Sequence, residues 1–217
     1  MRTFGFPEFL FILEAAKWTL ALSAIAFVGG AILGLAIALM RTSESRWARG
    51  VSTTFIQIFQ GTPLLLQLFL VFFGAPVLGL DINPWVAAGV ALILNSAAFL
   101  GEIWRGCIEA IPRGQWEAAE ALSLKYSARM RDVVLPQAFK IALAPTVGYV
   151  VQIIKGTSLA AIIGFTEITR AGQIINNATF QPLYVFTSVA AIYFVICWPL
   201  SLLAARMERR QALAMGR

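Results

Sequence analysis

Long apolar stretches without a charged residue constrain this chain more than any other feature. The first runs from Trp18 to Met40. Further stretches with no charge cover residues 50–80, 85–100, 141–154 and 171–205. A helix needs about 20 apolar residues to cross a bilayer. Of the 217 residues 59% are hydrophobic and 13% are charged, whereas about 25% are charged in an ordinary soluble domain. The sequence therefore predicts an all-α integral membrane protein.

Five transmembrane helices fit into the chain, joined by short loops, and together they form one membrane domain over residues 1–217. They are predicted at residues 18–40, 53–73, 85–104, 136–161 and 183–205. We expect a kink in the second span at Pro63, because a proline inside a helix removes a hydrogen bond and clashes with the preceding turn. A cleaved secretory signal is the alternative for the first span, although Glu8 and Glu14 precede it and its apolar run is too long.

The positive residues predict how the chain is oriented. Lys and Arg are retained on the cytoplasmic side of a membrane, and with five spans 13 of the 17 fall on one side. These are Arg41, Arg46, Arg49, Arg105, Arg113, Lys125, Arg129, Arg131, Lys140, Arg206, Arg209, Arg210 and Arg217. The other side holds Arg2, Lys17 and Arg170. We therefore expect an external N-terminus and a cytoplasmic C-terminus.

The sequence lacks the residues that several kinds of catalytic site require. There is no histidine, and Cys107 and Cys197 are far apart in apolar surroundings, so no metal site is predicted. No lysine follows a glycine, so the phosphate-binding loop G-x-x-x-x-G-K-[ST] is absent. We expect this chain to hydrolyse no ATP and to bind no cofactor. The excess of basic residues is attributed to the membrane and not to nucleic acid.

One long polar segment, residues 112–136, lies between the third and fourth predicted spans. Pro112 and Gly114 begin it, and the helix formers that follow predict a short helix over residues 115–122. A second short helix is expected from Ser127, a residue type favoured at N-caps, with a kink or break at Pro136. Two such helices would present an acidic and apolar surface suited to a soluble partner. A loop helix lying flat on lipid is the open alternative.

Polar residues also occur within the predicted spans, where contact with hydrocarbon is unfavourable, so we expect them to face the bundle interior or water. Gln60 and Gln67 are seven residues apart and would share one helix face. Interhelical hydrogen bonds are the alternative for both glutamines and Asn95, and for Lys155 the alternative is extension to the outer interface. The candidates for a substrate path are Gln60, Thr62, Asn95, Lys155, Thr157 and Ser158.

Two further pairs carry structural predictions. Glu102 and Arg105 are three residues apart and are expected to pair at the inner interface. Gly30 and Gly34 would allow close approach of another helix, either within this bundle or from a second copy.

Four motifs resemble those of bacterial ABC importer membrane subunits. Glu117-Ala118-Ala119 with Leu135-Pro136 resembles their EAA loop, and Ser123 stands where that loop has glycine. The polar amino acid permeases, which import histidine, glutamine or arginine, are similar at Gln60-Gly61-Thr62-Pro63-Leu64, Ala98-Phe99-Leu100-Gly101-Glu102 and Lys155-Gly156-Thr157-Ser158-Leu159. The resemblance runs from about residue 18 to residue 206. Serine in a left-handed conformation at position 123 would cost about 1 kcal/mol.

The resemblance implies a type I ABC importer permease in the bacterial cytoplasmic (inner) membrane. Two permease subunits, identical or merely similar, would assemble with two ATPase subunits that bind ATP and Mg. An external solute-binding protein would deliver a small polar amino acid, and the bundle would alternate between inward-open and outward-open states. ATPase coupling would involve Glu117, Ala118, Ala119, Glu120, Ala121, Leu122 and Ser123. The alternatives are a permease for another small polar solute, or an autonomous channel or secondary carrier.

Overall fold

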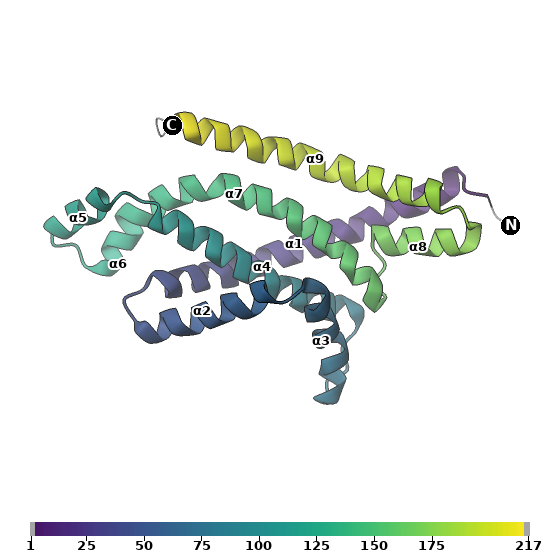
Figure 1. The fold of residues 1–217 in the computed structure, drawn as a ribbon, viewed down its shortest axis with the longest axis horizontal. Helices are drawn as coiled ribbons and strands as arrows, with labels where there is room; N and C mark the ends of the chain where they lie inside the picture. Colours follow the sequence, from purple (N-terminus) through teal and green to yellow (C-terminus); the bar gives the residue numbers. More distant parts are fainter. Residues whose placement is uncertain (1–2, 215–217) are drawn as a thin grey trace.

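The computed structural model of the protein describes residues 3–214, and all regular structure in that range is helical (Figure 1). The elements are α1 (Phe6–Thr42), α2 (Arg46–Gly61), α3 (Leu64–Val77), α4 (Pro84–Glu109), α5 (Arg113–Ala121), α6 (Tyr126–Ala128), the π-helical turn η1 (Arg129–Val134), α7 (Leu135–Gly156), the 3₁₀ segment η2 (Thr157–Ile163), α8 (Ile168–Thr179) and α9 (Pro182–Ala214). The all-α prediction is confirmed for this range. Arg2 and Arg217, which entered the prediction of orientation, lie outside it.

Within residues 3–214, four helices are long and apolar enough to cross a membrane singly: α1, α4, the continuous helix over residues 126–163, and α9. The bent pair α2–α3 adds a fifth span if its two helices are counted together. α4 packs against α1 and α7, and α7 packs against α9, whereas Figure 1 shows α3 turned across their common direction. The number of spans equals the expected five when the bent pair is counted as one span. The membrane boundaries and the orientation remain predictions.

Small residues bring the backbones of α1 and α4 close together. A Cβ atom added at Gly30 would lie 2.5 Å from the Cβ of Ser96, and one added at Gly34 would lie 3.1 Å from the carbonyl oxygen of Ala97. Moving apolar surface from lipid to a helix contact gains little, because lipid is equally apolar. Close packing of the two backbones stabilises the pair by dispersion instead. Gly30 and Gly34 therefore serve packing within this chain, one of the two roles that their spacing left open.

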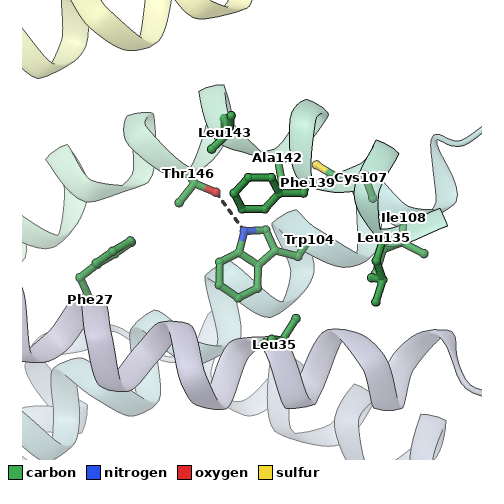
Figure 2. A pocket seen from close by; sticks show the side chains of 11 residues that line it. Phe27, Leu35, Trp104, Cys107, Ile108, Leu135, Phe139, Ala142, Leu143 and Thr146 are labelled. Carbon is green, nitrogen blue, oxygen red and sulfur yellow. Dashed lines mark hydrogen bonds between the residues drawn. The ribbon is translucent and has the colours of Figure 1, made fainter. Parts of the chain in front are cut away.

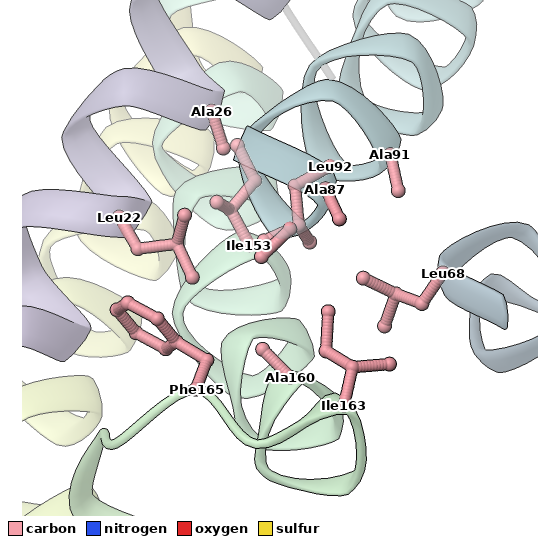
Figure 3. Packing of buried hydrophobic residues seen from close by; sticks show 11 residues of the cluster. Leu22, Ala26, Leu68, Ala87, Ala91, Leu92, Ile153, Ala160, Ile163 and Phe165 are labelled. Carbon is pink, nitrogen blue, oxygen red and sulfur yellow. The ribbon is translucent and has the colours of Figure 1, made fainter. Parts of the chain in front are cut away.

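An apolar cluster holds α3 and η2 against the bundle (Figure 3). Leu22 of α1, Leu68 of α3 and Leu92 of α4 are at most 2% exposed and pack in this cluster with Ile153 of α7 and Ile163 of η2. Loss of any of these side chains would leave a cavity that the rigid helices could fill only in part. The cluster thereby fixes the segments that carry the polar motifs.

The second predicted span, residues 53–73, is not one kinked helix. α2 and α3 meet at 101°, with Thr62 and Pro63 in extended conformation between them. The sequence places the break correctly, because a residue before proline is forced out of the helical region. The size of the bend is much larger than a proline kink. As a consequence Gln60 and Gln67 lie on different helices, and the expectation that they share one face is wrong.

The helix after the polar segment also differs from expectation. It begins at Tyr126 with Lys125 as N-cap, not with Ser127 as N-cap, and it continues past Pro136 instead of breaking there. The π-helical turn η1 makes this possible: the Leu135 N–H donates to the carbonyl of Met130, five residues back. The wider turn accommodates a proline ring that would clash with a regular α-helical turn. Residues 126–136 thus form the first turns of a membrane-length helix.

Candidate functional site

Two polar motifs that are distant in sequence meet at one place in the fold. Leu64 is the first residue of α3, directly after the break, and Gly156 ends α7. A Cβ atom added at Gly156 would lie 3.2 Å from Cδ2 of Leu64. Glycine therefore lets the end of α7 approach the start of α3, and this contact brings the α2–α3 break beside the change from α7 to η2.

The candidate path residues divide by exposure. Gln60, Thr62 and Lys155 are exposed, Ser158 is half-buried, and Asn95 and Thr157 are buried. Polar groups without a hydrogen-bond partner are unfavourable within lipid, so those at membrane depth are expected to face water or another subunit. The hydroxyls of Thr157 and Ser158 donate to their own helix, to the carbonyls of Ile154 and Lys155, each at 2.7 Å. Lys155 and the break residues are thus the groups that remain presented at the surface of this subunit.

The Gln67 side chain hydrogen-bonds to the residues at the α2–α3 break. Its Nε2 atom donates to the carbonyls of Phe59 (2.8 Å) and Thr62 (3.0 Å) and to the Thr62 hydroxyl (2.9 Å). The last carbonyls of a helix have no partner within that helix, and here a side chain from the next helix supplies the donor. Gln67 was not among the path candidates, and its only sequence signal was a polar residue within an apolar run.

Asn95 continues this hydrogen-bond network to α4 and α7. Its Nδ2 donates to Oε1 of Gln67 at 3.1 Å, and its Oδ1 accepts a long hydrogen bond from the Tyr149 hydroxyl at 3.4 Å. Gln60 also bonds between helices, from Nε2 to the carbonyl of Ala98 at 3.3 Å. Gln60, Gln67 and Asn95 therefore all make hydrogen bonds between helices. Asn95 supports the break instead of facing the surface.

The polar segment forms one short helix, α5, which packs on η1. Ala119 is only 2% exposed, and Trp116 packs in an apolar cluster with Ile111 and Met130. Arg129 of η1 also pairs with Glu120, at 3.3 Å. The outer surface of α5 and its C-terminus present Glu117, Ala118, Glu120, Ala121, Leu122 and Ser123. Of the seven predicted coupling residues, Ala119 therefore holds α5 in place and is covered by its own chain.

Ser123 ends α5 in the left-handed conformation, with φ of 56°. Its N–H donates to the carbonyl of Glu120, and the N–H of Leu124 donates to that of Ala119. This pair of bonds is the Schellman motif, which favours glycine at the position that Ser123 occupies. The departure from the EAA pattern keeps the conformation that glycine favours, at the expected cost of about 1 kcal/mol.

At the opposite end of α4 from the apolar cluster, the guanidinium group of Arg105 lies between two carboxylates. Its Nε donates to Glu102 at 2.9 Å, and it also pairs with Glu109. The predicted pair of Glu102 and Arg105 is confirmed. Within residues 3–214 no cluster of three or more His, Cys, Asp or Glu side chains is placed to hold a metal ion.

A buried carboxylate at the start of α8 was missed by the sequence analysis. Glu167 is fully buried and accepts hydrogen bonds from the N–H groups of Thr169 (2.9 Å) and Arg170 (2.8 Å) and from the Tyr193 hydroxyl (2.7 Å). Burial raises the pKa of the Glu167 carboxyl, although these donors act to lower it. An acidic residue directly before an amphipathic helix was the available signal. Glu167 joins α8 to α9.

The family model and the related proteins that match this chain all belong to one family of transport proteins. Residues 30–213 match the family model described as "Binding-protein-dependent transport system inner membrane component". The glutamine transport system permease protein GlnP of Escherichia coli (strain K12) is 36% identical, and the alignment covers 94% of each chain. The arginine transport system permease protein ArtQ of Bacillus subtilis (strain 168) is 37% identical, again over 94% of each chain.

Solved structures show the same relationship. The crystal structure of an amino acid ABC transporter with histidines contains a chain that is 34% identical, with a TM-score of 0.88, covering 96% of this chain and 100% of that chain. An inward-facing structure of the MetNI methionine ABC transporter, at 18% identity and a TM-score of 0.78, shares the fold. The chain thus has the type I ABC permease fold and belongs to the family of binding-protein-dependent transport system inner membrane components, the permease subunits of ABC importers.

Proposed function

We propose that this permease subunit forms the translocation path for a polar amino acid in the bacterial inner membrane. An external solute-binding protein delivers the amino acid, and separate ATPase subunits, which hold ATP and Mg, drive its passage. The similarity to permeases for glutamine and arginine supports this substrate class. The observation that carries the proposal is the contact of Leu64 with Gly156, because it brings the broken second span beside the Lys155 motif.

The exposed groups at this contact match the chemistry of an amino acid. The Lys155 ammonium group attracts the carboxylate that all amino acids share, since an ion pair away from bulk water is little screened. Gln60, Thr62 and Ser158 offer amide and hydroxyl groups for the other polar atoms. Buried Asn95 donates to the Gln67 side chain, and buried Thr157 donates to the Ile154 carbonyl of its own helix. A second permease subunit, identical or similar, completes the path on the exposed side.

The outer surface of α5 is the contact for the ATPase subunits. Glu117 and Glu120 provide charge there, and Leu122, which is 75% exposed, provides an apolar contact. α5 packs on η1, and η1 belongs to the continuous helix that runs from Tyr126 to Ile163. Movement of α5 is therefore transmitted along this helix toward Lys155. Such rigid-body motion is the basis of alternating access. This role places α5 and the C-terminus in the cytoplasm and the N-terminus outside.

The test is ATP-driven uptake by the complete transporter, with its ATPase subunits and solute-binding protein, in proteoliposomes. We expect uptake of glutamine, arginine or histidine by the wild type. Glu117→Lys should abolish uptake while the permease remains in the membrane, whereas Glu44→Lys, an exposed change in the α1–α2 loop, should preserve it. Full uptake by the Glu117 variant would contradict the coupling role.

The same assay separates the alternatives. Uptake of a different small solute, with none of the three amino acids transported, would reassign the substrate class. Flux through the permease without ATPase subunits would indicate an autonomous channel or carrier.

A further inference from the structure

An apolar groove of about 450 Å³ lies between α1 and α7, with α4 at its base (Figure 2). Phe27 and Leu35 line it from α1, and Phe139 and Leu143 line it from α7. Figure 2 shows the Trp104 side chain of α4 between the two helices.

The chemistry of the groove selects an apolar occupant. Its main polar atoms satisfy each other, because Nε1 of Trp104 donates to the Thr146 hydroxyl at 2.9 Å. A polar amino acid placed here would lose its hydration without gaining hydrogen bonds, which is unfavourable. The groove is therefore distinct in chemistry from the proposed substrate path. A hydrocarbon chain, by contrast, would replace exposed apolar surface with contact.

A second, polar pocket of about 260 Å³ adjoins the groove at Ile108, which lines both. Arg41 and Arg49 line this pocket together with Trp116. The Nε atom of Arg41 is buried and has no hydrogen-bond partner among the residues that the structure describes. Arg49 is held in position by donating to the carbonyls of Ser43 (2.7 Å) and Glu44 (3.0 Å). A buried donor without a partner beside a fixed arginine is suited to an anion.

The nearby acids do not cancel this positive charge. Glu109 also lines the polar pocket, and Glu102 interacts electrostatically with Arg41. Both carboxylates, however, bind the guanidinium group of Arg105. Three arginines thus face two glutamates, and the balance in this region is positive.

We propose that the groove and the pocket together form a binding site for an anionic phospholipid. The phosphate lies against Arg41 and Arg49, and one acyl chain extends past Ile108 into the groove toward Trp104 and Phe27. Basic pockets between membrane helices are suited to anionic headgroups, and Arg41 stands at the end of α1 while Leu35 and Phe27 lie progressively deeper in that helix. The site goes beyond the transport function and lies outside the path residues. A bound lipid would contact α1, α4, α5 and α7 together and so stabilise their packing.

The test measures lipid binding and not transport, so it is independent of the proposed function. The complete transporter is placed in nanodiscs of phosphatidylcholine, with or without phosphatidylglycerol. Bound lipid is then counted by native mass spectrometry and the Tm is recorded. Phosphatidylglycerol should bind in preference and raise the Tm. Arg41→Gln with Arg49→Gln should lower its affinity about 30-fold, the equivalent of about 1 kcal/mol per basic residue.

Two further variants control for charge and for the acyl chain. Arg206→Gln with Arg209→Gln removes the same charge from exposed positions on α9 and should leave the Tm shift unchanged. Leu143→Trp should fill part of the groove and reduce retained lipid without lowering the Tm in phosphatidylcholine alone. If Leu143→Trp fails to fold, the comparison of the two arginine double variants tests the proposal by itself.

Three results would overturn the proposal. The first is an equal phosphatidylglycerol shift in both arginine double variants. The second is equal protection by inorganic phosphate in detergent, together with no effect of Leu143→Trp, because this would indicate a free-anion site. The third is efficient cross-linking of Leu143→Cys to the second permease subunit, because this would show that protein covers the groove.

Discussion

The side-chain oxygen of Gln67 accepts a 3.1 Å hydrogen bond from the amide of Asn95. The same Gln67 side chain donates to the carbonyls of Phe59 and Thr62 at the 101° bend. One amide therefore satisfies the broken end of α2 and is itself held by α4. The conformation of the break thus depends on a contact between helices.

Gln67→Leu should destabilise the break. The substitution leaves the Phe59 and Thr62 carbonyls and the Asn95 amide without their partner, and such buried groups cost about 1–3 kcal/mol. We expect a lower Tm for the purified transporter and a reduced maximal rate of uptake. Gln60→Leu, which removes one bond of 3.3 Å, is the control and should cost less stability. Equal losses in the two variants would contradict the special role of Gln67.

Ser123→Gly should stabilise the permease by about 1 kcal/mol, because glycine adopts positive φ without the steric cost that serine bears. Ser127→Gly is the matched control. Ser127 lies in the helical segment Tyr126–Ala128, where glycine is unfavourable by several tenths of a kcal/mol. The Tm should therefore rise in the first variant and fall in the second. A fall in both would argue against left-handed backbone at position 123.

Lys155→Gln should weaken substrate binding during transport. Loss of a charge-assisted hydrogen bond to a carboxylate costs about 1.5–3 kcal/mol, which corresponds to a rise in KM of roughly 10- to 150-fold. Lys140→Gln removes another exposed charge, near the other end of α7, and should leave KM unchanged. Concentration-dependent uptake measures both. An unchanged KM in the Lys155 variant would remove this residue from the substrate path.

Glu167 should make the stability of the α8–α9 junction depend on pH. Its pKa is raised in the folded protein, so the folded state binds the proton more tightly than the unfolded state does. The resulting stabilisation is complete below the unfolded pKa of about 4.3 and is lost as pH rises through the folded pKa. Glu167→Gln should flatten this part of the Tm profile, whereas Glu14→Gln, at a position with a 78% exposed side chain, should not. Identical profiles for wild type and the Glu167 variant would contradict this assignment.

Local chemistry explains which features could be predicted. Uncharged runs such as Trp18–Met40 indicate membrane helices, because composition alone decides whether a segment is stable in lipid. Thr62-Pro63 marks the break and Ser123 marks the helix end, because steric limits on φ and ψ act within a few residues. The motifs around them were enough to indicate the permease family. Each of these features depends on the residues of one segment.

Features that join distant segments were decided by the tertiary structure. The size of the bend at Pro63 depends on Gln67 and Asn95, and the passage of the helix through Pro136 depends on the packing of η1 with α5 and α7. The role of Gly30 and Gly34 was settled only by finding α4 beside them. The burial of Ala119 likewise required the position of η1. Sequence periodicity shows that a helix has a face to bury or a group to satisfy, but the partner lies elsewhere in the chain and is chosen by the packing of the whole bundle.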